Sequence, residues 1–356
     1  MRFKQSFNGR RVLVTGHTGF KGTWLCAWLK LLGADVFGIA LTPNTEPNMF
    51  SLIDLEDDVD HNIIDIRNLK HLSERIDLIQ PEIVFHLAAQ PLVRRSYQEP
   101  LNTFETNVMG TANILEALRV VADIKAFICI TTDKVYHNSE QQHAYSEGDA
   151  LGGKDPYSAS KVAAEMIVNG YRGLFDGRSC PVALATARGG NVIGGGDWSE
   201  DRLVPDLVRA LSVGDTLNIR NLNATRPWQH VLCLCHGYLA LAEKLLNHPN
   251  DTNYAWNFGP SAADTVTVSA MLSQFGTKWD LPKISLHPET DMPESNFLML
   301  DSSLAISELG WDPAWTLNRA VSMTAQWYKV QANNGDMRDL SQRQILQYNS
   351  DMMCDD

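Results

Sequence analysis

Short apolar runs alternate with stretches of helical spacing over the first half of the chain. Residues 11–15 form a β-branched run that ends at a glycine, and residues 20–32 carry helical spacing that stops at Gly33. The same criteria predict strands at 36–41, 82–88, 126–131 and 182–187, and helices at 69–79, 102–121 and 157–175. This alternation predicts an α/β fold, a doubly wound parallel (Rossmann) sheet with helices on both faces.

The pattern changes after residue 191. Helical spacing at 231–246, 267–275 and 317–331 is interleaved with short extended runs such as 217–220 and 296–300. We therefore expect a Rossmann domain at 1–190 and a smaller C-terminal α/β substrate lobe at 191–335, with some crossing of the chain between the lobes. Residues 336–356 form a polar tail that is either frayed or packed as an arm.

Composition excludes several classes of protein. The chain is 44% hydrophobic and 20% charged, and it has no apolar run long enough to span a membrane and no secretory pattern at its start, so we expect a cytoplasmic protein. A net charge of −12 argues against binding nucleic acid. The six cysteines lack a paired metal-ligand spacing, so reduced core thiols are favoured over a metal site.

A G-x-x-G-x-x-G pattern lies between the first predicted strand and the first predicted helix. It comprises Gly16, Gly19 and Gly22, with Thr18 and Phe20 between them. Missing side chains let the backbone approach a pyrophosphate, and the free N–H groups at the helix start hold its negative charge. The alternative is a glycine-rich turn without a ligand. We interpret the turn as a dinucleotide site.

The choice of dinucleotide rests on the second strand. It ends in Ala40-Leu41-Thr42 and lacks the acidic residue that commonly binds the ribose hydroxyls of NAD. Because no arginine or lysine occurs between 36 and 66 to meet a 2′-phosphate, NAD is favoured over NADP. Asp65 and Ile66 are candidates for the adenine edge, with a solvated turn as the alternative for Asp65.

Tyr157 and Lys161 are four residues apart on one face of a predicted helix, so the ammonium can lie near the phenol and favour phenolate. Thr132, at the end of the central strand, can bond the hydroxyl that Tyr157 deprotonates. Asp133 and Lys134 add an acid and a potential base, the two groups that elimination of water needs. The alternatives are a surface Tyr/Lys pair and a salt-bridged loop pair.

Several motifs together resemble the extended short-chain dehydrogenase/reductase family. They are the glycine turn, Leu87-Ala88-Ala89-Gln90, Asn107 in Thr106-Asn107-Val108-Met109-Gly110-Thr111, and Tyr157-x-x-x-Lys161. Within this family, Gly16 to Trp24, Thr131 to Tyr136 and Thr225 to Val231 are similar to the CDP-glucose 4,6-dehydratases. The resemblance covers nearly the whole chain and implies that Leu87 to Gln90 and Asn107 belong to the cofactor site.

The resemblance also implies a reaction. Tyr157 takes the sugar O4 proton while hydride passes from C4 to NAD⁺, and the 4-ketone acidifies the C5 hydrogen. Lys134 then removes the C5 proton and Asp133 protonates the departing O6 hydroxyl, after which hydride returns to C6. The related deoxythymidine-diphosphate sugar dehydratases carry Glu at the position of Lys134. The expected product is CDP-4-keto-6-deoxyglucose, on the way to deoxysugars of the lipopolysaccharide O-antigen.

Candidate substrate-binding residues are polar and lie mainly in the second lobe. They are Asn191, Arg202, Arg220, Arg226 and His230. Arg226 and His230 have the residue types that clamp a diphosphate, since guanidinium matches phosphate oxygens with two parallel bonds. Arg94, Arg95 and Tyr97 either border the hexose or form a solvated loop.

By resemblance, the helices at 102–122 and 157–175 pair in a homodimer, with a tetramer as a larger alternative. Three other functions compete with dehydration of CDP-glucose. A nucleotide-sugar 4-epimerase would use the same Thr, Tyr and Lys, but Asp133-Lys134 argues against it. Another nucleoside-diphosphate glucose is a second alternative. A non-catalytic cofactor-binding sensor is a third, and the intact Thr132, Tyr157 and Lys161 argue against that.

Overall fold

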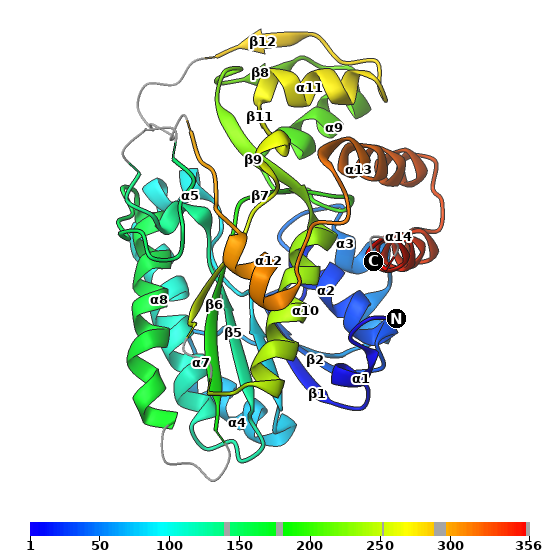
Figure 1. The fold of residues 1–356 in the computed structure, drawn as a ribbon. Coiled ribbons are helices and arrows are strands. Elements are labelled where there is room, and N and C mark those ends of the chain that lie inside the picture. The colour runs from blue at the N-terminus through cyan, green and yellow to red at the C-terminus, as the bar shows by residue number, and fades with distance from the viewer. Residues whose placement is uncertain (139–142, 176–180, 251–252, 288–296, 354–356) are drawn as a thin grey trace.

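The computed structural model describes residues 1–138, 143–175, 181–250, 253–287 and 297–353. Within these residues the main sheet has seven strands in the order β10-β6-β5-β4-β1-β2-β3, and every neighbouring pair is parallel (Figure 1). The strands are β1 (Arg11–Thr15), β2 (Asp35–Ala40), β3 (Asp60–Ile63), β4 (Ile83–His86), β5 (Ala126–Ile130), β6 (Ala183–Gly189) and β10 (Ala255–Phe258). The predicted Rossmann architecture is confirmed.

Two strands of this sheet were not predicted from the sequence. β3 reads Asp-His-Asn-Ile, and it is polar because it lies at the edge of the sheet and pairs only with β2. β10 comes from the part of the chain that was assigned to the second lobe, and it pairs in parallel with β6, Ala255 opposite Thr186. The chain therefore returns to the main sheet after it has built part of the smaller lobe.

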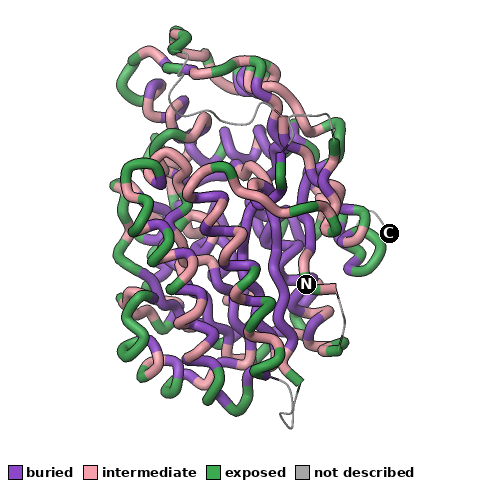
Figure 2. Tube along the Cα trace, turned by 90° about the vertical axis from the view of Figure 1, so that its left-hand side faces the viewer, coloured by how far each residue is buried: buried purple, intermediate pink, exposed green. Residues whose placement is uncertain are grey.

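Helices cover both faces of the sheet, and a buried apolar cluster fills each side. One side holds α4 (Leu69–Ile79), α7 (Gly110–Leu118) and α8 (Pro156–Phe175). The other holds α2 (Phe20–Leu31), α10 (Val231–Asn247) and the C-terminal helices α12 (Ser303–Leu309), α13 (Leu317–Ala332) and α14 (Met337–Asp351). Figure 2 shows the buried residues concentrated along the strands and the inner faces of these helices.

The helix predicted at 102–121 is interrupted. The segment runs as α6 (Pro100–Phe104), a π-helical turn η2 (Glu105–Met109) and then α7. Asn107 lies in this turn and is buried. Its amide group is bonded to Gln90 and Ser160, so the wider turn coincides with a polar side chain that is held inside the protein.

The smaller lobe lies above the carboxyl end of the main sheet in Figure 1. It contains two small sheets, ordered β11-β9-β7 and β12-β8, in the described residues. Their strands are β7 (Asn191–Ile193), β8 (Leu217–Ile219), β9 (Thr225–His230), β11 (Thr265–Thr267) and β12 (Ile284–Leu286). The helices α9 (Leu203–Val213) and α11 (Val268–Gly276) complete it. Of the extended run expected at 296–300, residue 296 lies outside the described residues.

The shorter helical elements lie in connections between these units. They are α1 (Lys4–Phe7), α3 (Met49–Leu52), η1 (Leu55–Asp57), α5 (Val93–Gln98), η3 (Asp133–Val135) and η4 (Ala262–Asp264). Among them, η3 follows β5 directly and carries two of the candidate catalytic residues.

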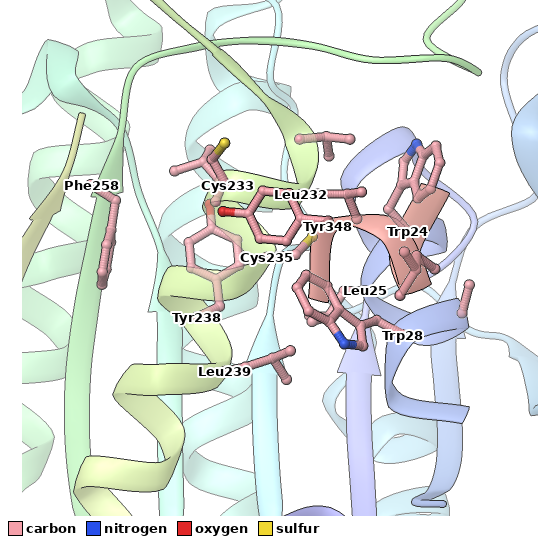
Figure 3. Close-up of a cluster of buried hydrophobic side chains, with 14 of the residues drawn as sticks. Trp24, Leu25, Trp28, Leu232, Cys233, Cys235, Tyr238, Leu239, Phe258 and Tyr348 are labelled. Carbon is pink, nitrogen blue, oxygen red and sulfur yellow. The ribbon is translucent and has the colours of Figure 1, made fainter. Parts of the chain in front are cut away.

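The polar tail forms an ordered helix, α14, which resolves the choice left open by the sequence in favour of a packed arm. Tyr348 is fully buried, and its ring lies 5.6 Å from that of Trp28 on α2. Figure 3 shows Tyr348 between side chains of α2 and α10. The helix therefore braces α2, the helix that begins at the glycine turn.

The described cysteines, Cys26, Cys129, Cys233 and Cys235, are buried free thiols; Cys180 and Cys354 lie outside the described residues. Burial raises the pKa of Cys233 to about 11. The described part of the chain contains no group of three or more His, Cys, Asp or Glu arranged to hold a metal ion. In the same residues, no helix is both long and apolar enough to cross a membrane.

Candidate active site

The glycine turn has the geometry that a dinucleotide needs. Gly16 has a φ of 76°, and a Cβ there would lie 2.7 Å from the backbone nitrogen of Ala88. A Cβ on Gly22 would overlap the carbonyl oxygen of Gly16. The helix that follows starts at Phe20 after Gly19, and no side chain caps it. Its first N–H groups are therefore available to a phosphate.

Thr18 and His17 of this turn are engaged by the protein. Thr18 Oγ1 donates to the carbonyl of Leu41 at 2.8 Å, which ties the turn to the end of β2. The buried ring of His17 lies against Phe50, and its Nε2 is 2.7 Å from Nδ1 of His61 on β3. Burial lowers the pKa of His17 to about 4, so the ring is neutral near pH 7.

The predicted adenine end is polar. Asp65 forms an ion pair with Arg67, with 2.6 Å between the carboxylate and the guanidinium, and this bond lowers the pKa of Asp65. Ile66 is buried beside Gly110. Arg67 follows the window in which the sequence analysis found no cation, but Asp65 and Asn102 hold its guanidinium. The positive charge of Arg67 is thus partly compensated, so the structure does not favour binding of the 2′-phosphate of NADP.

Leu87, Ala88, Ala89 and Gln90 follow β4 at the carboxyl edge of the sheet. Gln90 N donates to Asn107 Oδ1 at 2.8 Å, and Asn107 Nδ2 donates to Ser160 Oγ on α8 at 2.8 Å. The amides of Gln90 and Asn107 are thus bonded within the protein. These bonds tie the loop after β4 to η2 and α8. The contacts of Gln90 and Asn107 with the cofactor stay a prediction.

Tyr157 and Lys161 lie on the first turns of α8, beside the end of β5. Tyr157 hydrogen-bonds Thr132, and burial raises the pKa of the phenol to about 12, against the opposing effects of Thr132 and the charge of Arg202. Lys161 Nζ donates to the carbonyl of Ile130 at 3.0 Å, and burial lowers the pKa of its ammonium. The alternative of a surface Tyr/Lys pair is therefore wrong.

Asp133 and Lys134 lie beside this group. Thr132 Oγ1 donates to Asp133 Oδ1 at 3.0 Å, and Lys134 Nζ is 3.9 Å from the same oxygen. The Asp133 side chain is 2% exposed and that of Lys134 is 26% exposed. Asp133 Oδ2 is buried without a hydrogen-bond partner, near Gly190. The contact between Asp133 and Lys134 is long for a salt bridge, and the second carboxylate oxygen of Asp133 has no hydrogen-bond partner among the described residues.

A cleft of about 1210 Å³ runs from this group into the smaller lobe. Thr132, Asp133, Lys134 and Tyr157 line one part, and Asn191, Arg202, Arg220 and Arg226 also line it. The cleft therefore joins residues that are far apart in the sequence. Four of the five predicted substrate-binding residues meet in it.

His230 does not line the cleft, and its predicted contact with a diphosphate disagrees with the structure. Its side chain is fully buried, between Trp24 and Trp315. Nδ1 accepts from the backbone nitrogen of Leu232 at 3.2 Å, so His230 caps the N-terminus of α10.

Arg202 acts close to the reacting end of the cleft. Its guanidinium is 2.9 Å from the buried carboxylate of Asp197, and its charge acts on Tyr157. Arg94 lines the cleft and pairs with Asp201 at 2.7 Å, which connects α5 to the loop before α9. Arg95 pairs with Glu99, four residues further along the chain, and does not line the cleft.

Lys21 is a residue of the site that sequence reasoning missed. It lines the cleft, and burial, followed by the charges of Arg202 and Lys161, lowers the pKa of its ammonium to about 8. The available signal was a lysine inside a glycine turn, at a position followed by the otherwise buried residues of α2. The cleft is thus more cationic than the net charge of the chain suggests.

The parallel sheet, the glycine turn and the Tyr157/Lys161 pair beside Thr132 together define an extended short-chain dehydrogenase/reductase. A family model described as GDP-mannose 4,6 dehydratase matches residues 13–324, and the chain belongs to this family. The CDP-glucose 4,6-dehydratase of Salmonella typhimurium (strain LT2) is 43% identical to the chain, and the alignment covers 98% of each sequence. The family resemblance inferred from the motifs is confirmed.

Solved structures agree with this assignment at the level of fold. Epimerase Mth375 from Methanothermobacter thermautotrophicus matches with a TM-score of 0.80 at 21% identity, covering 94% of this chain and 96% of that one. MoeE5 in complex with UDP-glucose and NAD matches with a TM-score of 0.76 at 22% identity, covering 90% and 99%. Because an epimerase shares the fold, the reaction must be argued from the site.

Proposed function

We propose that this protein dehydrates CDP-glucose to CDP-4-keto-6-deoxyglucose with bound NAD. The relative from Salmonella typhimurium, named CDP-glucose 4,6-dehydratase, supports this at 43% identity over nearly the full length of both chains. The observation that carries the proposal is the position of Asp133 and Lys134. They lie beside the Thr132 and Tyr157 hydroxyls in one cleft, whereas oxidation or epimerisation at C4 needs no such couple.

NAD fits the residues present. The crowded Gly16 and Gly22 positions and the uncapped start of α2 would hold its pyrophosphate, and Asp65 and Ile66 would edge its adenine. Bound NAD would supply the oxidant for C4 and the hydride that is returned to C6. Lys161, held by the Ile130 carbonyl, would add a positive charge near Tyr157 in the loaded site.

Tyr157 is the group that takes the proton from the sugar O4 hydroxyl, and Thr132, to which it is bonded, orients that hydroxyl. In the ligand-free protein the phenol is protonated at neutral pH because burial raises its pKa to about 12. The positive charge of Arg202 favours the phenolate, and we assign the same effect to Lys161 in the loaded site. We expect bound cofactor and substrate to favour the phenolate further.

Elimination of water requires a base at C5 and an acid at O6. Lys134 is the more exposed member of the couple. As the neutral amine it takes the C5 proton, which the 4-ketone has made acidic. Asp133, with a buried and unpartnered Oδ2, donates a proton to the departing O6 hydroxyl, which leaves as water. The proton held by Lys134 returns to C5 when the product forms. The proton that Tyr157 took from O4 replaces the one that Asp133 gave, so each turnover releases one water.

Arg226 and Asn191 are the residues we assign to the sugar diphosphate, with Arg220 further along the same cleft. A guanidinium can donate two parallel bonds to phosphate oxygens. Arg226 is largely buried, so the structure holds it against the cleft wall. Arg202 contributes charge at the hexose end.

The direct test compares CDP-, UDP- and deoxythymidine-diphosphate glucose as substrates of the purified protein. We expect a 4-keto-6-deoxy product, detected by its absorbance in alkali, to form fastest from the CDP sugar. CDP-galactose as the product would indicate an epimerase, and no product with any sugar would indicate a non-catalytic cofactor-binding protein.

Asp133→Asn and Lys134→Ala test the assigned roles in the same assay. Loss of an acid or base costs about 10²–10⁴-fold in rate. Normal product formation by both variants would refute the assignment of Asp133 and Lys134, without touching the substrate class.

We also propose that the chain forms a homodimer through α6 to α7 and α8, with a tetramer as a further association. Large apolar side chains are exposed on these segments. They are Leu101, Phe104, Met109, Met166 and Leu174. So many exposed apolar side chains are unusual for a solvated helix face, and a second copy of the chain would cover them.

The division of labour between the lobes is part of the proposal. Residues 1–190 would bind NAD and residues 191–335 would bind the nucleotide sugar, with β10 returning to the main sheet. We assign the product to deoxysugar biosynthesis, with the lipopolysaccharide O-antigen as its expected destination.

A further inference from the structure

A buried ion pair lies behind the catalytic segment and outside the cleft lining. Arg188, near the end of β6, donates through Nε to Glu165 Oε1 at 2.9 Å, and its Nη2 donates to Glu165 Oε2. The two side chains are 4% and 5% exposed. Neither residue has a role in the reaction described above.

The pair is bonded to both ends of the segment that carries the catalytic residues. Thr131, which precedes Thr132, donates through Oγ1 to Glu165 Oε1 at 2.7 Å. Tyr136, two residues after Lys134, accepts from Arg188 Nη1 at 2.8 Å. One salt bridge therefore holds the chain on either side of residues 132–135.

The same pair also reaches the redox residues. Glu165 lies on α8, four residues after Lys161 and eight after Tyr157, so it follows them along one helix. Arg188 is followed by Gly189 and Gly190, and Gly190 lies beside Asp133 Oδ2. Three elements that supply the site, β5, β6 and α8, meet at this salt bridge.

We infer that Glu165 and Arg188 are positioning residues that fix the Asp133/Lys134 couple relative to Tyr157 and Lys161. The inference rests on the proposed dehydratase function. Oxidation at C4 and elimination across C5–C6 act on neighbouring carbons of one sugar, so both groups must be in place in one complex. A displacement of about 1 Å can cost about 10²-fold in rate.

If the Glu165–Arg188 salt bridge served only stability, its replacement would affect folding and not the balance between oxidation and elimination. Replacing a buried ion pair by apolar residues of similar volume is often neutral or stabilising, whereas removing one partner leaves a buried charge and destabilises. The double variant Glu165→Met/Arg188→Met should therefore fold. Thr131→Val and Tyr136→Phe are milder changes, each of which removes one link from the pair to the catalytic segment.

The experiment follows product formation and the near-ultraviolet absorbance of reduced nicotinamide after CDP-glucose is added to NAD-loaded protein. We expect the double variant and Thr131→Val to form product about 10- to 100-fold more slowly. Because Tyr157 stays on α8, oxidation should fall less than elimination. Reduced nicotinamide should then accumulate in these variants and not in the wild type.

Glu82→Gln is the matched control. Glu82 comes just before β4, at the amino-terminal end of the strands and away from the cleft. It pairs with Arg10 and Lys125, and its side chain is 13% exposed. We expect this variant to lose stability without accumulating reduced nicotinamide.

Unchanged product formation in the double variant and in Thr131→Val would overturn the inference. A loss of rate in proportion to the folded fraction, without reduced nicotinamide, would also overturn it. If the wild type itself forms no 4-keto product, the proposed function fails instead, so the two failures are distinguishable.

Discussion

Tyr157 shows how the surroundings of one residue set the pH dependence of the reaction. In its proposed role as the base, the phenol must lose its proton, and burial raises its pKa to about 12. We therefore expect activity to rise with pH along a limb that reports this group. The positive charge of Arg202 opposes the shift. Cofactor and substrate then alter the apparent pKa in the loaded enzyme.

We predict that Arg202→Leu moves the rising limb of the kcat profile to higher pH. Removal of the cation makes the phenolate less stable, so a higher pH is needed to form it. The measurement is kcat at saturating CDP-glucose over a range of pH. Arg343→Leu, at an exposed position on α14, is the control and should leave the limb in place; an unmoved limb in the Arg202 variant would contradict the prediction.

Gly22 tests the glycine turn by a single methyl group. A Cβ at this position overlaps the carbonyl oxygen of Gly16, so Gly22→Ala must shift the turn. We expect a loss of about 1–3 kcal/mol in the free energy of unfolding and weaker binding of NAD. Urea denaturation and a fluorescence titration with NAD measure the two effects.

Gly148→Ala is the matched control for this change. Gly148 lies in the turn before Asp149, and a Cβ there meets no atom within 4 Å. Alanine in place of glycine at a compatible position stabilises a protein by about 0.4–1 kcal/mol, so this variant should be stabilised and should bind NAD normally. Equal behaviour of the two variants would mean that the crowding at Gly22 is unimportant.

At the scale of elements, α8 has two functional faces. Its first turns carry Tyr157 and Lys161 into the site, while Met166 and Leu174 are about half exposed on the surface proposed for dimerisation. A helix that serves both the site and an interface would make activity depend on assembly. The proposal can be tested without touching the catalytic residues.

We predict that Met166→Glu gives a particle of lower mass than the wild type. A carboxylate placed in an apolar interface is desolvated without a partner, which disfavours association. Size-exclusion chromatography with light scattering measures the mass. Leu78→Glu, at an exposed position of α4, is the control and should keep the wild-type mass. A wild-type mass for Met166→Glu would remove this face from the proposed interface.

At the scale of the whole molecule, the C-terminal arm closes the core on the side of α2. The matched family model ends at residue 324, and α14 lies beyond it. The Tyr348 ring fills the space beside Trp28, and Trp315 donates to Asp351 at 2.8 Å. The arm therefore supports the helix whose N-terminus is proposed to hold the cofactor.

Tyr348→Ala should cost about 3–5 kcal/mol in the free energy of unfolding, because it leaves a cavity among fully buried aromatic side chains. Leu346→Ala, on the exposed face of the same helix, should change stability by less than about 0.5 kcal/mol. Urea denaturation of both variants is the measurement. A small effect at Tyr348 would show that α14 is not part of the cooperative core.

The strands β1, β2, β4, β5 and β6 were predictable because each is a short run of apolar residues. The helices α2, α4, α8 and α10 were predictable because their apolar positions repeat with helical spacing. The polar strand β3 lacked such a signal, and β10 required knowledge of its partner β6. Spacing alone also could not indicate the π-helical turn that buries Asn107.

Local chemistry in the sequence determined the glycine turn, the Tyr157/Lys161 pair and the Asp133/Lys134 couple, because each lies within a few residues of one element. Only the tertiary structure decided that His230 caps a helix, that Lys21 faces the cleft and that Glu165 meets Arg188. Those roles depend on contacts between segments far apart in the chain. Such contacts are set by packing across the sheet. The pattern of apolar and polar residues within one segment does not indicate which distant segment it will contact.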